Sequence, residues 1–381
     1  MIKKALLFSL IFLCGATLLA QEIQSFRPYT LLNPPSDISP IKTRGEGEST
    51  PVFKPKQWTK SEHLLLEKKL LWFHNAKYGL FFHYLAPPEC SSEKWNEMVN
   101  SIDVEKFADQ VKETGAGYVI ITIGQNQLYS CAPNPVLEKL WKLEPNTYTS
   151  TRDLPMEAGK ALSKRGIKLM LYLNADNLYK LPCPKSFVKE TDRFENWLKV
   201  LEWYSYHYGN LCSGWWIDGL NADWTSNYWS RVHETLKLGN QDAITASASY
   251  GLSEFTHGHC GAIWEDQQKY RKPYYGRWEP IYNIQWHVLQ YLGSTWAMSD
   301  TISHSTLSLV NYSRDIIKGG GIITFDVGTY DSGSYYDTRL SWVNKTKKPT
   351  VSLSIPEGQM KQLIAIRDVL KDIKPSDGSG N

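Results

Sequence analysis

A set of polar and aromatic side chains stands where short apolar runs of the sequence end. They are His83, Gln125, Asn126, Asn174, Asp218, Ser247, Glu265, Trp296 and Asp326. If these runs are parallel strands, their carboxyl ends meet at one edge of the sheet, where the active sites of such folds are built. Carboxylates, a histidine, amides and an indole suit a pocket for a polyhydroxylated ligand such as a sugar. A purely structural rim would not need carboxylates after three apolar strands.

Asp218 is the strongest candidate for a chemical role. It ends the run Trp215-Trp216-Ile217-Asp218-Gly219. A carboxylate directly after such bulky apolar residues is partly desolvated, and the following glycine lets a ligand or another backbone approach closely. These features suit the nucleophile of a retaining glycosidase. The structural alternative is a helix N-cap or a salt-bridged aspartate at the rim.

A retaining glycosidase also needs a second carboxyl group, about 5 to 5.5 Å from the nucleophile, as general acid and base. Glu265 is the first candidate, because it directly follows the predicted strand that ends in Ala262-Ile263-Trp264. Glu279 is the second candidate and lies in the long loop after that strand. The sequence leaves both open.

Eight apolar runs are predicted to be strands, and most are separated by segments that can form a helix, such as 104–114 and 193–207. The runs cover residues 77–83, 117–123, 167–174, 214–218, 243–248, 261–264, 288–296 and 320–327. Near-continuous apolar strands alternating with helices predict an α/β fold with a parallel sheet. Eight such units in roughly 300 residues predict a single (β/α)8 TIM-like barrel. The alternative is an open doubly wound sheet, although no G-x-G-x-x-G motif opens the first unit.

The two ends of the chain differ from this pattern. Residues 1–20 are predicted to be a signal peptide, since two lysines precede an apolar stretch that ends at Ala20. Residues 21–60 read as an extended lead-in, 61–373 as the catalytic barrel and 374–381 as a disordered tail. Because few residues follow the eighth run, we expect a single domain with no additional β-sandwich after the barrel. We therefore expect an exported protein, periplasmic or secreted.

Composition narrows the possible partners. The formal net charge is +3 and the basic residues are scattered, which excludes nucleic acid and an anionic membrane surface as expected partners. The apolar stretch near the start is too short for a membrane span, so no membrane insertion is expected. The cluster His257-Gly258-His259-Cys260 lacks a fourth ligand at a fixed spacing, so we read it as an ordinary loop and predict no metal or cofactor. The 15 tryptophans and 22 tyrosines suit either a large core or a cleft for a glycan.

Several segments, in order along the chain, resemble motifs of the retaining α-L-fucosidases of glycoside hydrolase family 29. Lys-Tyr-Gly-Leu-Phe-Phe-His at 77–83 is similar to the family's K-F-G-x-F-x-H-W-G, whose histidine contacts the sugar. Segment 115–118 resembles A-G-A-K-Y, and segment 152–168 resembles the R-D segment and third strand. Segment 215–219 is similar to the nucleophile motif W-x-D-G, which maps onto Asp218, and segment 318–328 resembles G-G-N-L-L-L-N-V-G-P.

The chain also departs from the family at three places, one of which is Tyr84-Leu85 after His83, where the family has Trp-Gly. Where the family has K-H-H-D-G-F, this chain has Gly-Gln-Asn-Gln-Leu-Tyr at 124–129, so amides replace both histidines. In several members a Trp-Glu pair holding the acid/base lies ten positions before the tryptophan of W-G-Y. If Trp296 is that tryptophan, the pair here is Trp286-His287. Other members place the carboxylate near the sixth strand, where Glu265 stands.

The resemblance implies a retaining exo-glycosidase that removes a terminal L-fucose or related sugar from a glycan or polysaccharide without a cofactor. Asp218 would be the nucleophile, with Glu265 or Glu279 as acid/base. The expected sugar contacts are His83, Trp95, Gln125, Asn126, Tyr129, Asn174, Trp216, His287 and Trp296. Trp95 is included because the loop 89–100 is expected to form one wall of the pocket. The alternative is a catalytically silent carbohydrate-binding barrel that kept the fold and lost the chemistry.

Overall fold

The structure is a computed structural model that describes residues 56–87, 90–125, 129–174, 190–219, 226–247, 253–257, 276–279, 282–293, 296, 300–329 and 351–376. The predicted signal peptide and most of the predicted lead-in and tail lie outside these residues. So do Asn126, the predicted strand 261–264 and Glu265. No helix in the described residues is both long and apolar enough to cross a membrane.

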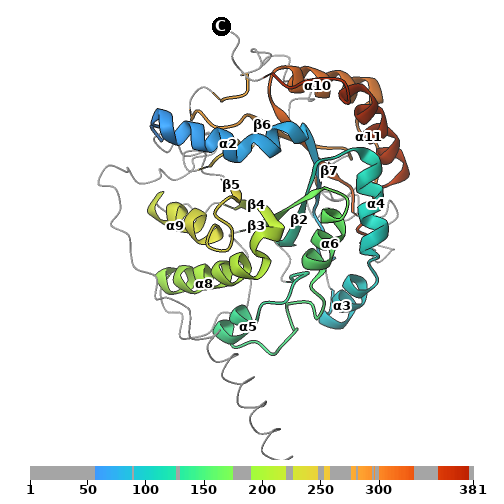
Figure 1. The fold of residues 1–381 in the computed structure, drawn as a ribbon. Helices are drawn as coiled ribbons and strands as arrows, with labels where there is room; N and C mark the ends of the chain where they lie inside the picture. Colours follow the sequence, from blue (N-terminus) through green and yellow to red (C-terminus); the bar gives the residue numbers. More distant parts are fainter. Residues whose placement is uncertain are drawn as a thin grey trace, which may run out of the picture. The chain divides into compact units, whose positions relative to one another are not determined.

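Seven strands form one parallel sheet in the centre of Figure 1. They are β1 (Tyr78–Phe82), β2 (Tyr118–Gly124), β3 (Lys168–Asn174), β4 (Cys212–Asp218), β5 (Ile244–Ser247), β6 (His287–Tyr291) and β7 (Ile322–Val327). Their order is β5-β4-β3-β2-β1-β7-β6, and every neighbouring pair is parallel. Each corresponds to one of the predicted apolar runs. The described strands thus form the seven-stranded parallel α/β sheet expected of a TIM-like barrel.

Backbone hydrogen bonds continue beyond the edge strand β5. The Glu254 N–H donates to Thr245 O at 2.9 Å, and the Gln285 N–H donates to Glu254 O at 3.1 Å. The Thr256 N–H in turn donates to Gln285 O at 2.9 Å. Residues 253–257 are therefore hydrogen-bonded to β5 on one side and to the chain just before β6 on the other.

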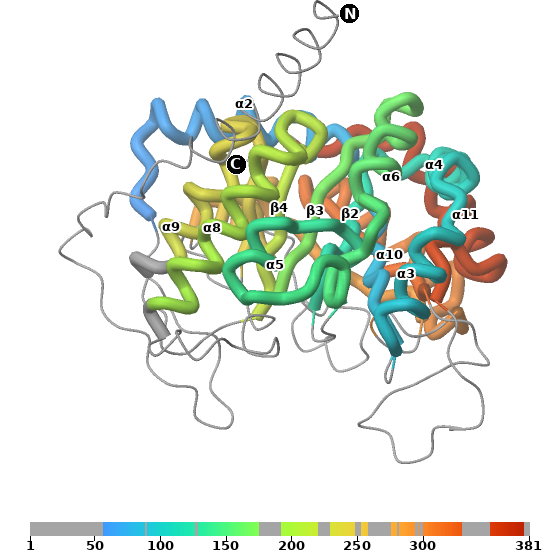
Figure 2. The backbone as a smooth tube through the Cα atoms, turned by 90° about the horizontal axis from the view of Figure 1, so that it is seen from below, coloured from blue at the N-terminus to red at the C-terminus, as the bar shows by residue number. Residues whose placement is uncertain are grey.

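Helices cover the outer face of the sheet, as Figures 1 and 2 show. They are α3 (Ser92–Asn100), α4 (Val104–Thr114), α5 (Pro135–Trp141), α6 (Leu154–Ser163), α8 (Glu190–Tyr208), α9 (Ser226–Leu236), α10 (Thr306–Lys318) and α11 (Glu357–Leu370). Local sequence sets their ends. In α4 the Asp103 side chain accepts hydrogen bonds from two backbone N–H groups of the first turn, and Gly115 ends the helix with a φ of 79°.

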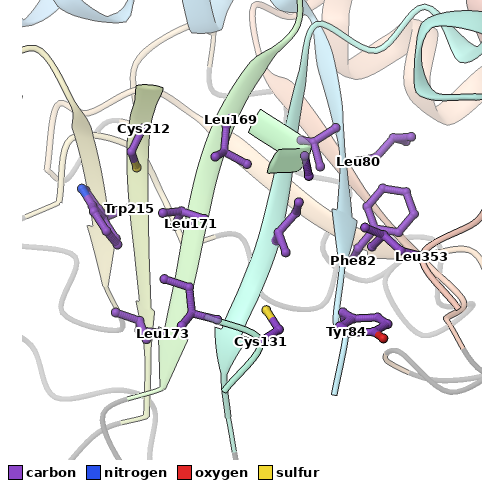
Figure 3. Packing of buried hydrophobic residues seen from close by; sticks show 14 of the residues in the cluster. Leu80, Phe82, Tyr84, Cys131, Leu169, Leu171, Leu173, Cys212, Trp215 and Leu353 are labelled. Atoms are coloured by element: carbon purple, nitrogen blue, oxygen red, sulfur yellow. The ribbon is translucent and has the colours of Figure 1, made fainter. Parts of the chain in front are cut away.

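Alternation along each strand separates two cores. On β3, Leu169, Leu171 and Leu173, labelled in Figure 3, belong to the buried cluster that also holds residues of the helices, such as Leu162 and Leu198. Met170 and Tyr172 face the other way, into the space that the strands enclose. Because side chains of a strand alternate between its two faces, Asn174 is on the inner face too. The same alternation on β4 turns Trp216 and Asp218 inward.

Helix α2 (Lys60–Ala76) packs on the inner core at the amino ends of the strands. Its Phe73 ring lies 4.9 Å from the ring of Tyr118, the first residue of β2, and 4.9 Å from that of Phe255. Leu66 and Leu70 belong to the same cluster. Apolar packing therefore fills the amino end of the inner space, and polar side chains gather at the carboxyl end.

We expect Leu70→Ala to lower the free energy of unfolding by about 2–5 kcal/mol, because it empties a fully buried site under the inner core. Leu65→Ala on the same helix is the control. That side chain is 67% exposed, so its loss should change stability by less than about 0.5 kcal/mol. Urea unfolding of both variants measures the difference. Equal effects would contradict the assignment of α2 as the cover of the inner core.

Candidate active site

Asp218, the last residue of β4, is held by a neighbouring strand. The Tyr172 hydroxyl of β3 donates a hydrogen bond of 2.6 Å to Asp218 Oδ2. The tyrosine is buried, whereas the Asp218 side chain keeps 25% of its surface exposed. The carboxylate is therefore held by β3 through one oxygen and remains partly exposed to solvent.

The hydrogen bond keeps a fixed direction because Tyr172 does not ionise at ordinary pH. Burial raises the pKa of Tyr172 well above its usual value, and the charge of Asp218 and the hydrogen bond to it raise it further. A hydrogen bond with the Asn174 side chain acts in the opposite sense but does not reverse the shift. Tyr172 therefore remains protonated at ordinary pH and donates to Oδ2 rather than to Oδ1 of the same carboxylate.

His257 faces that second oxygen. Its Nε2 lies 3.8 Å from Asp218 Oδ1, and the imidazole is almost fully buried. The Trp216 ring packs edge-on against it, with ring centroids 4.8 Å apart. An imidazole therefore stands beside the second oxygen of the Asp218 carboxylate.

Residues 253–257 are held in place by a buried group of charged side chains centred on Glu254. Glu254 Oε1 accepts from the ammonium groups of Lys69 and Lys237, each at 3.0 Å, and Oε2 accepts from the Thr245 N–H at 2.8 Å. Burial raises the pKa of the Glu254 carboxyl, but the two lysines outweigh it and the net shift is downward. The ionised carboxylate thus links α2, the end of α9 and β5 to this segment.

A second carboxylate–histidine pair lies across the site. His83, directly after β1, and Asp326 of β7 are joined by a 2.6 Å hydrogen bond between Nδ1 and Oδ1, and both are buried. The His83 ring lies 3.9 Å from the Phe81 ring and 5.4 Å from the Tyr172 ring. The charge of Asp326 also contributes to the raised pKa of Tyr172. Tyr172 therefore connects the two pairs.

The structure brings together four of the predicted site residues. Asn174 and Asp218 are paired in the register of β3 and β4, and His83 lies beside Tyr172. The Trp296 ring is 6.3 Å from the His83 ring and packs edge-on against Tyr291. Gln125 directly follows β2 and is half-buried. Asn126 and Glu265 lie outside the described residues.

Two predicted tryptophan contacts are buried instead. Trp95 of α3 is only 1% exposed, and its Nε1–H donates to Ser130 O at 2.8 Å while the ring packs against Tyr84. It belongs to the core rather than to a pocket wall, because its large apolar surface is better stabilised away from water. Trp216 is equally buried and supports His257 from beneath. The predicted contact Tyr129 is partly exposed, and its hydroxyl donates to Cys90 O at 2.8 Å.

His287 forms hydrogen bonds inside the protein through both ring nitrogens. It is the first residue of β6, where Nδ1 lies 2.9 Å from Thr256 O and Nε2 lies 2.7 Å from Thr324 Oγ1. Burial lowers the pKa of His287 to about 3, so the ring is neutral near pH 7. Both nitrogens are used within the protein, which leaves the imidazole no contact to offer a sugar.

Glu279 lies at the opposite end of the strands from Asp218. Residues 276–279 pair antiparallel with residues 282–285, directly before β6 begins. Trp278 packs against His63 of α2, and Arg277 forms a 2.9 Å ion pair with Glu67 of α2. A chain that builds parallel strands must return to the amino end before each new strand, and Glu279 stands at the end of that return. The structure therefore does not bring this predicted acid to the nucleophile.

Sequence reasoning did not assign Tyr172 or His257 to the site. Tyr172 was detectable in principle, because it shares the inward face of β3 with Asn174. His257 was considered only as a fragment of a metal site or a loop residue. Among the described residues, no group of three or more His, Cys, Asp or Glu side chains could hold a metal ion. His259 and Cys260 of that sequence cluster lie outside the described residues.

Comparison with known proteins shows likeness in structure only. No family model matches the sequence, and no curated protein matches it. An endo-fucoidan hydrolase from glycoside hydrolase family 107, MfFcnA4, has a TM-score of 0.59 and 16% identity, and the match covers 80% of this chain and 54% of that chain. The chain thus spans about half the length of that protein.

Two α-L-fucosidase structures are similar to a comparable degree. Alpha-L-fucosidase isoenzyme 1 from Paenibacillus thiaminolyticus matches with a TM-score of 0.57 and 13% identity, over 80% of this chain and 76% of that chain. A fucosyltransferase mutant of the alpha-L-fucosidase AlfC matches with a TM-score of 0.55 and 15% identity, over 80% and 98% of the two chains. At these identities the likeness shows the fold alone, so this chain has a fucosidase-like fold.

The buried histidine makes acid sensitivity testable. Because the folded pKa of His287 is depressed from 6.5 to about 3, the unfolded chain binds a proton in that window that the folded chain does not. Stability contributed by the neutral ring is complete above pH 6.5 and is lost as pH falls toward 3. Between pH 6 and 4 we expect the unfolding free energy of His287→Gln to fall less steeply than that of the wild type, by about 1.4 kcal/mol per pH unit. Urea titrations at several pH values measure the slopes, and parallel curves would contradict the assignment.

Proposed function

We propose that this protein is an exported retaining glycosidase that removes a terminal L-fucose or a related sugar from a glycan or polysaccharide. The observation that carries the proposal is Asp218 at the carboxyl end of β4, anchored through Oδ2 by Tyr172 and faced at Oδ1 by His257. The fold likeness to a fucoidan hydrolase and to α-L-fucosidases supports the substrate class. The predicted signal peptide supports export.

The proposal includes a complete eight-stranded barrel. Residues 253–257 would occupy the position between β5 and β6, which their backbone hydrogen bonds to Thr245 and Gln285 support. In a closed barrel the carboxyl ends of all strands surround a single pocket. His83, Asp218, His257 and Trp296 would then face one sugar from different sides.

In the first chemical step, Asp218 Oδ1 attacks the anomeric carbon and the bond from that carbon to the leaving oxygen breaks. The leaving oxygen takes a proton from the general acid. In the second step, water attacks the same carbon, the bond to Asp218 breaks, and the proton of the water passes to the group that acted as acid. Two inversions return the original configuration. Tyr172 keeps Oδ2 occupied throughout, so the attacking oxygen is always Oδ1.

Two groups are candidates for the acid and base. His257 is supported by its 3.8 Å distance from Asp218 Oδ1 and by the ability of an imidazole to donate and accept a proton. Glu265 is supported by the sequence, which puts it only eight residues after His257. We take His257 as the first candidate and Glu265 as the second. Neither requires a metal or an organic cofactor.

A second function, a sugar-binding barrel without turnover, is favoured by one observation. Of the two glutamates expected as acid, Glu279 lies at the wrong end of the strands, as its position beside α2 indicates. If neither His257 nor Glu265 transfers a proton, the site binds a sugar and leaves it intact. Binding of a glycan with no bond cleavage across a panel of glycosides would favour this alternative.

The nucleophile is tested with an aryl α-L-fucoside and a panel of other aryl glycosides. We expect Asp218→Asn to lower kcat/KM roughly a thousandfold or more on whichever glycoside the wild type cleaves, because the amide cannot form the covalent intermediate. In Asp218→Gly, added azide should restore cleavage and yield a glycosyl azide of inverted configuration. Tyr172→Phe should retain measurable activity, since it removes only the anchor. Wild-type rates in Asp218→Asn would contradict the proposal.

The acid is tested through the leaving group. A nitrophenolate leaves without help, whereas an alkoxide needs a proton, so loss of the acid slows glycosides with poor leaving groups selectively. We expect His257→Gln to reduce cleavage of an alkyl glycoside roughly a hundredfold more than cleavage of a dinitrophenyl glycoside. Glu265→Gln is the matched variant and should slow both substrates equally. If instead Glu265→Gln shows the selective loss, Glu265 is the acid and His257 only orients Asp218.

A further inference from the structure

We propose that Asp326 is a positioning residue that locks His83 in one tautomer, so that His83 Nε2 reads a hydroxyl group of the sugar as a hydrogen-bond acceptor. The inference rests on the proposed function, because it assumes that the ligand beside His83 is a sugar. It adds a requirement for a free hydroxyl at one position of that sugar.

The hydrogen bond between the two residues fixes the proton. His83 Nδ1 lies 2.6 Å from Asp326 Oδ1. An ionised carboxylate can accept but not donate, so the proton of this hydrogen bond belongs to Nδ1. Which ring nitrogen of a neutral imidazole holds the proton is set by the partner of the other one, so the proposal takes Nε2 as the nitrogen with the lone pair; a doubly protonated ring would carry an N–H there instead. Among the described residues, no hydrogen-bond partner of Nε2 is found.

The surroundings hold both partners rigidly. Asp326 is 1% exposed, and it lies beside Phe81 in the register of β1 and β7. The His83 ring packs against the Phe81 ring at 3.9 Å. The Thr329 hydroxyl donates to His83 O at 3.0 Å, which ties the chain after β7 to the chain after β1. The imidazole therefore has little freedom to turn its other nitrogen toward the carboxylate.

Packing alone does not account for a carboxylate at this position. One layer deeper on the same face of β7, Thr324 fills the equivalent place with a hydroxyl that bonds Tyr118 and His287. Burying a carboxylate costs much more than burying a hydroxyl unless a strong partner compensates. On the inner face of β7, Asp326 stands closer to the carboxyl end of the strand, where it bonds His83, whose ring lies 5.4 Å from the Tyr172 ring. Its position favours a role in the site over a role in the core.

The acceptor role makes a chemical prediction about the ligand. A sugar hydroxyl can donate to a lone pair on Nε2, whereas a methyl ether at the same position cannot. Rejection of a ligand that leaves a buried polar group unpaired is strong in such sites. The wild type should therefore discriminate against one mono-O-methyl derivative of its sugar more than against the others.

The experiment compares wild type, Asp326→Asn and the control Thr324→Val, which alters a buried polar residue of the same strand and face. Nitrogen NMR of protein labelled in histidine reads the tautomer of His83 directly and needs no substrate. We expect a single form protonated at Nδ1 in the wild type and in Thr324→Val, and a mixture of both forms in Asp326→Asn. Unchanged His83 signals in Asp326→Asn, or a doubly protonated His83 ring in the wild type, would overturn the proposal.

Kinetics supply the second readout. On the cleaved glycoside, Asp326→Asn should raise KM roughly tenfold with kcat altered less, and discrimination against the critical methyl ether should disappear. Thr324→Val should keep both. Loss of kcat with the discrimination retained would overturn the role in hydroxyl recognition. If the wild type cleaves none of the glycosides, the proposed function fails, while the NMR result still decides whether Asp326 locks His83.

Discussion

The site depends on one interaction, the hydrogen bond from a buried tyrosine to a carboxylate at the end of an apolar strand. Asp218 follows two tryptophans and an isoleucine, a setting in which an unpartnered carboxylate would be costly. The Tyr172 hydroxyl compensates for this cost at 2.6 Å, and its raised pKa ensures that it always donates. The same bond engages Oδ2, whereas Oδ1 faces His257 at 3.8 Å. In the proposed mechanism, this contact between β3 and β4 both stabilises the carboxylate and directs Oδ1 toward the sugar.

The residues inside the curved sheet differ between the amino and carboxyl ends of the strands. At the amino end, Leu70 and Phe73 of α2 pack with strand residues, and polar groups such as His287 are neutral and fully bonded. At the carboxyl end, carboxylates pair with histidines, and Tyr172 joins the two pairs. Because the strands are parallel, this division is the same for each of them. The charged cluster around Glu254 lies outside the site but fixes the segment that presents His257.

The sequence predicted which segments form strands better than it predicted how far along the barrel axis each polar residue lies. Apolar runs located the seven described strands. They also predicted that Asp218 stands at the carboxyl end of a strand, and it is the last residue of β4. Period-two alternation indicates which face a residue occupies but not its height along the strand. His287 was named as a sugar contact from its spacing to Trp296 in the family motif, and the structure puts it at the first residue of β6. Glu279 lies near α2 and Trp95 is buried, positions that the sequence could not give because a segment between strands can run back to the amino end or fold into the core. His257 was not recognised because its approach to Asp218 depends on pairing between distant segments.

The central claim is that Asp218 forms a covalent bond to the sugar. It is tested most directly by incubating the protein with an α-L-fucosyl fluoride in which fluorine replaces the hydroxyl next to the anomeric carbon, a substitution that slows release of the intermediate. Mass spectrometry of the digested protein then locates the label. The account predicts one fluorofucosyl group on the peptide that contains Asp218, and none in Asp218→Asn. A label on a different residue, in protein that still cleaves fucosides, would contradict it.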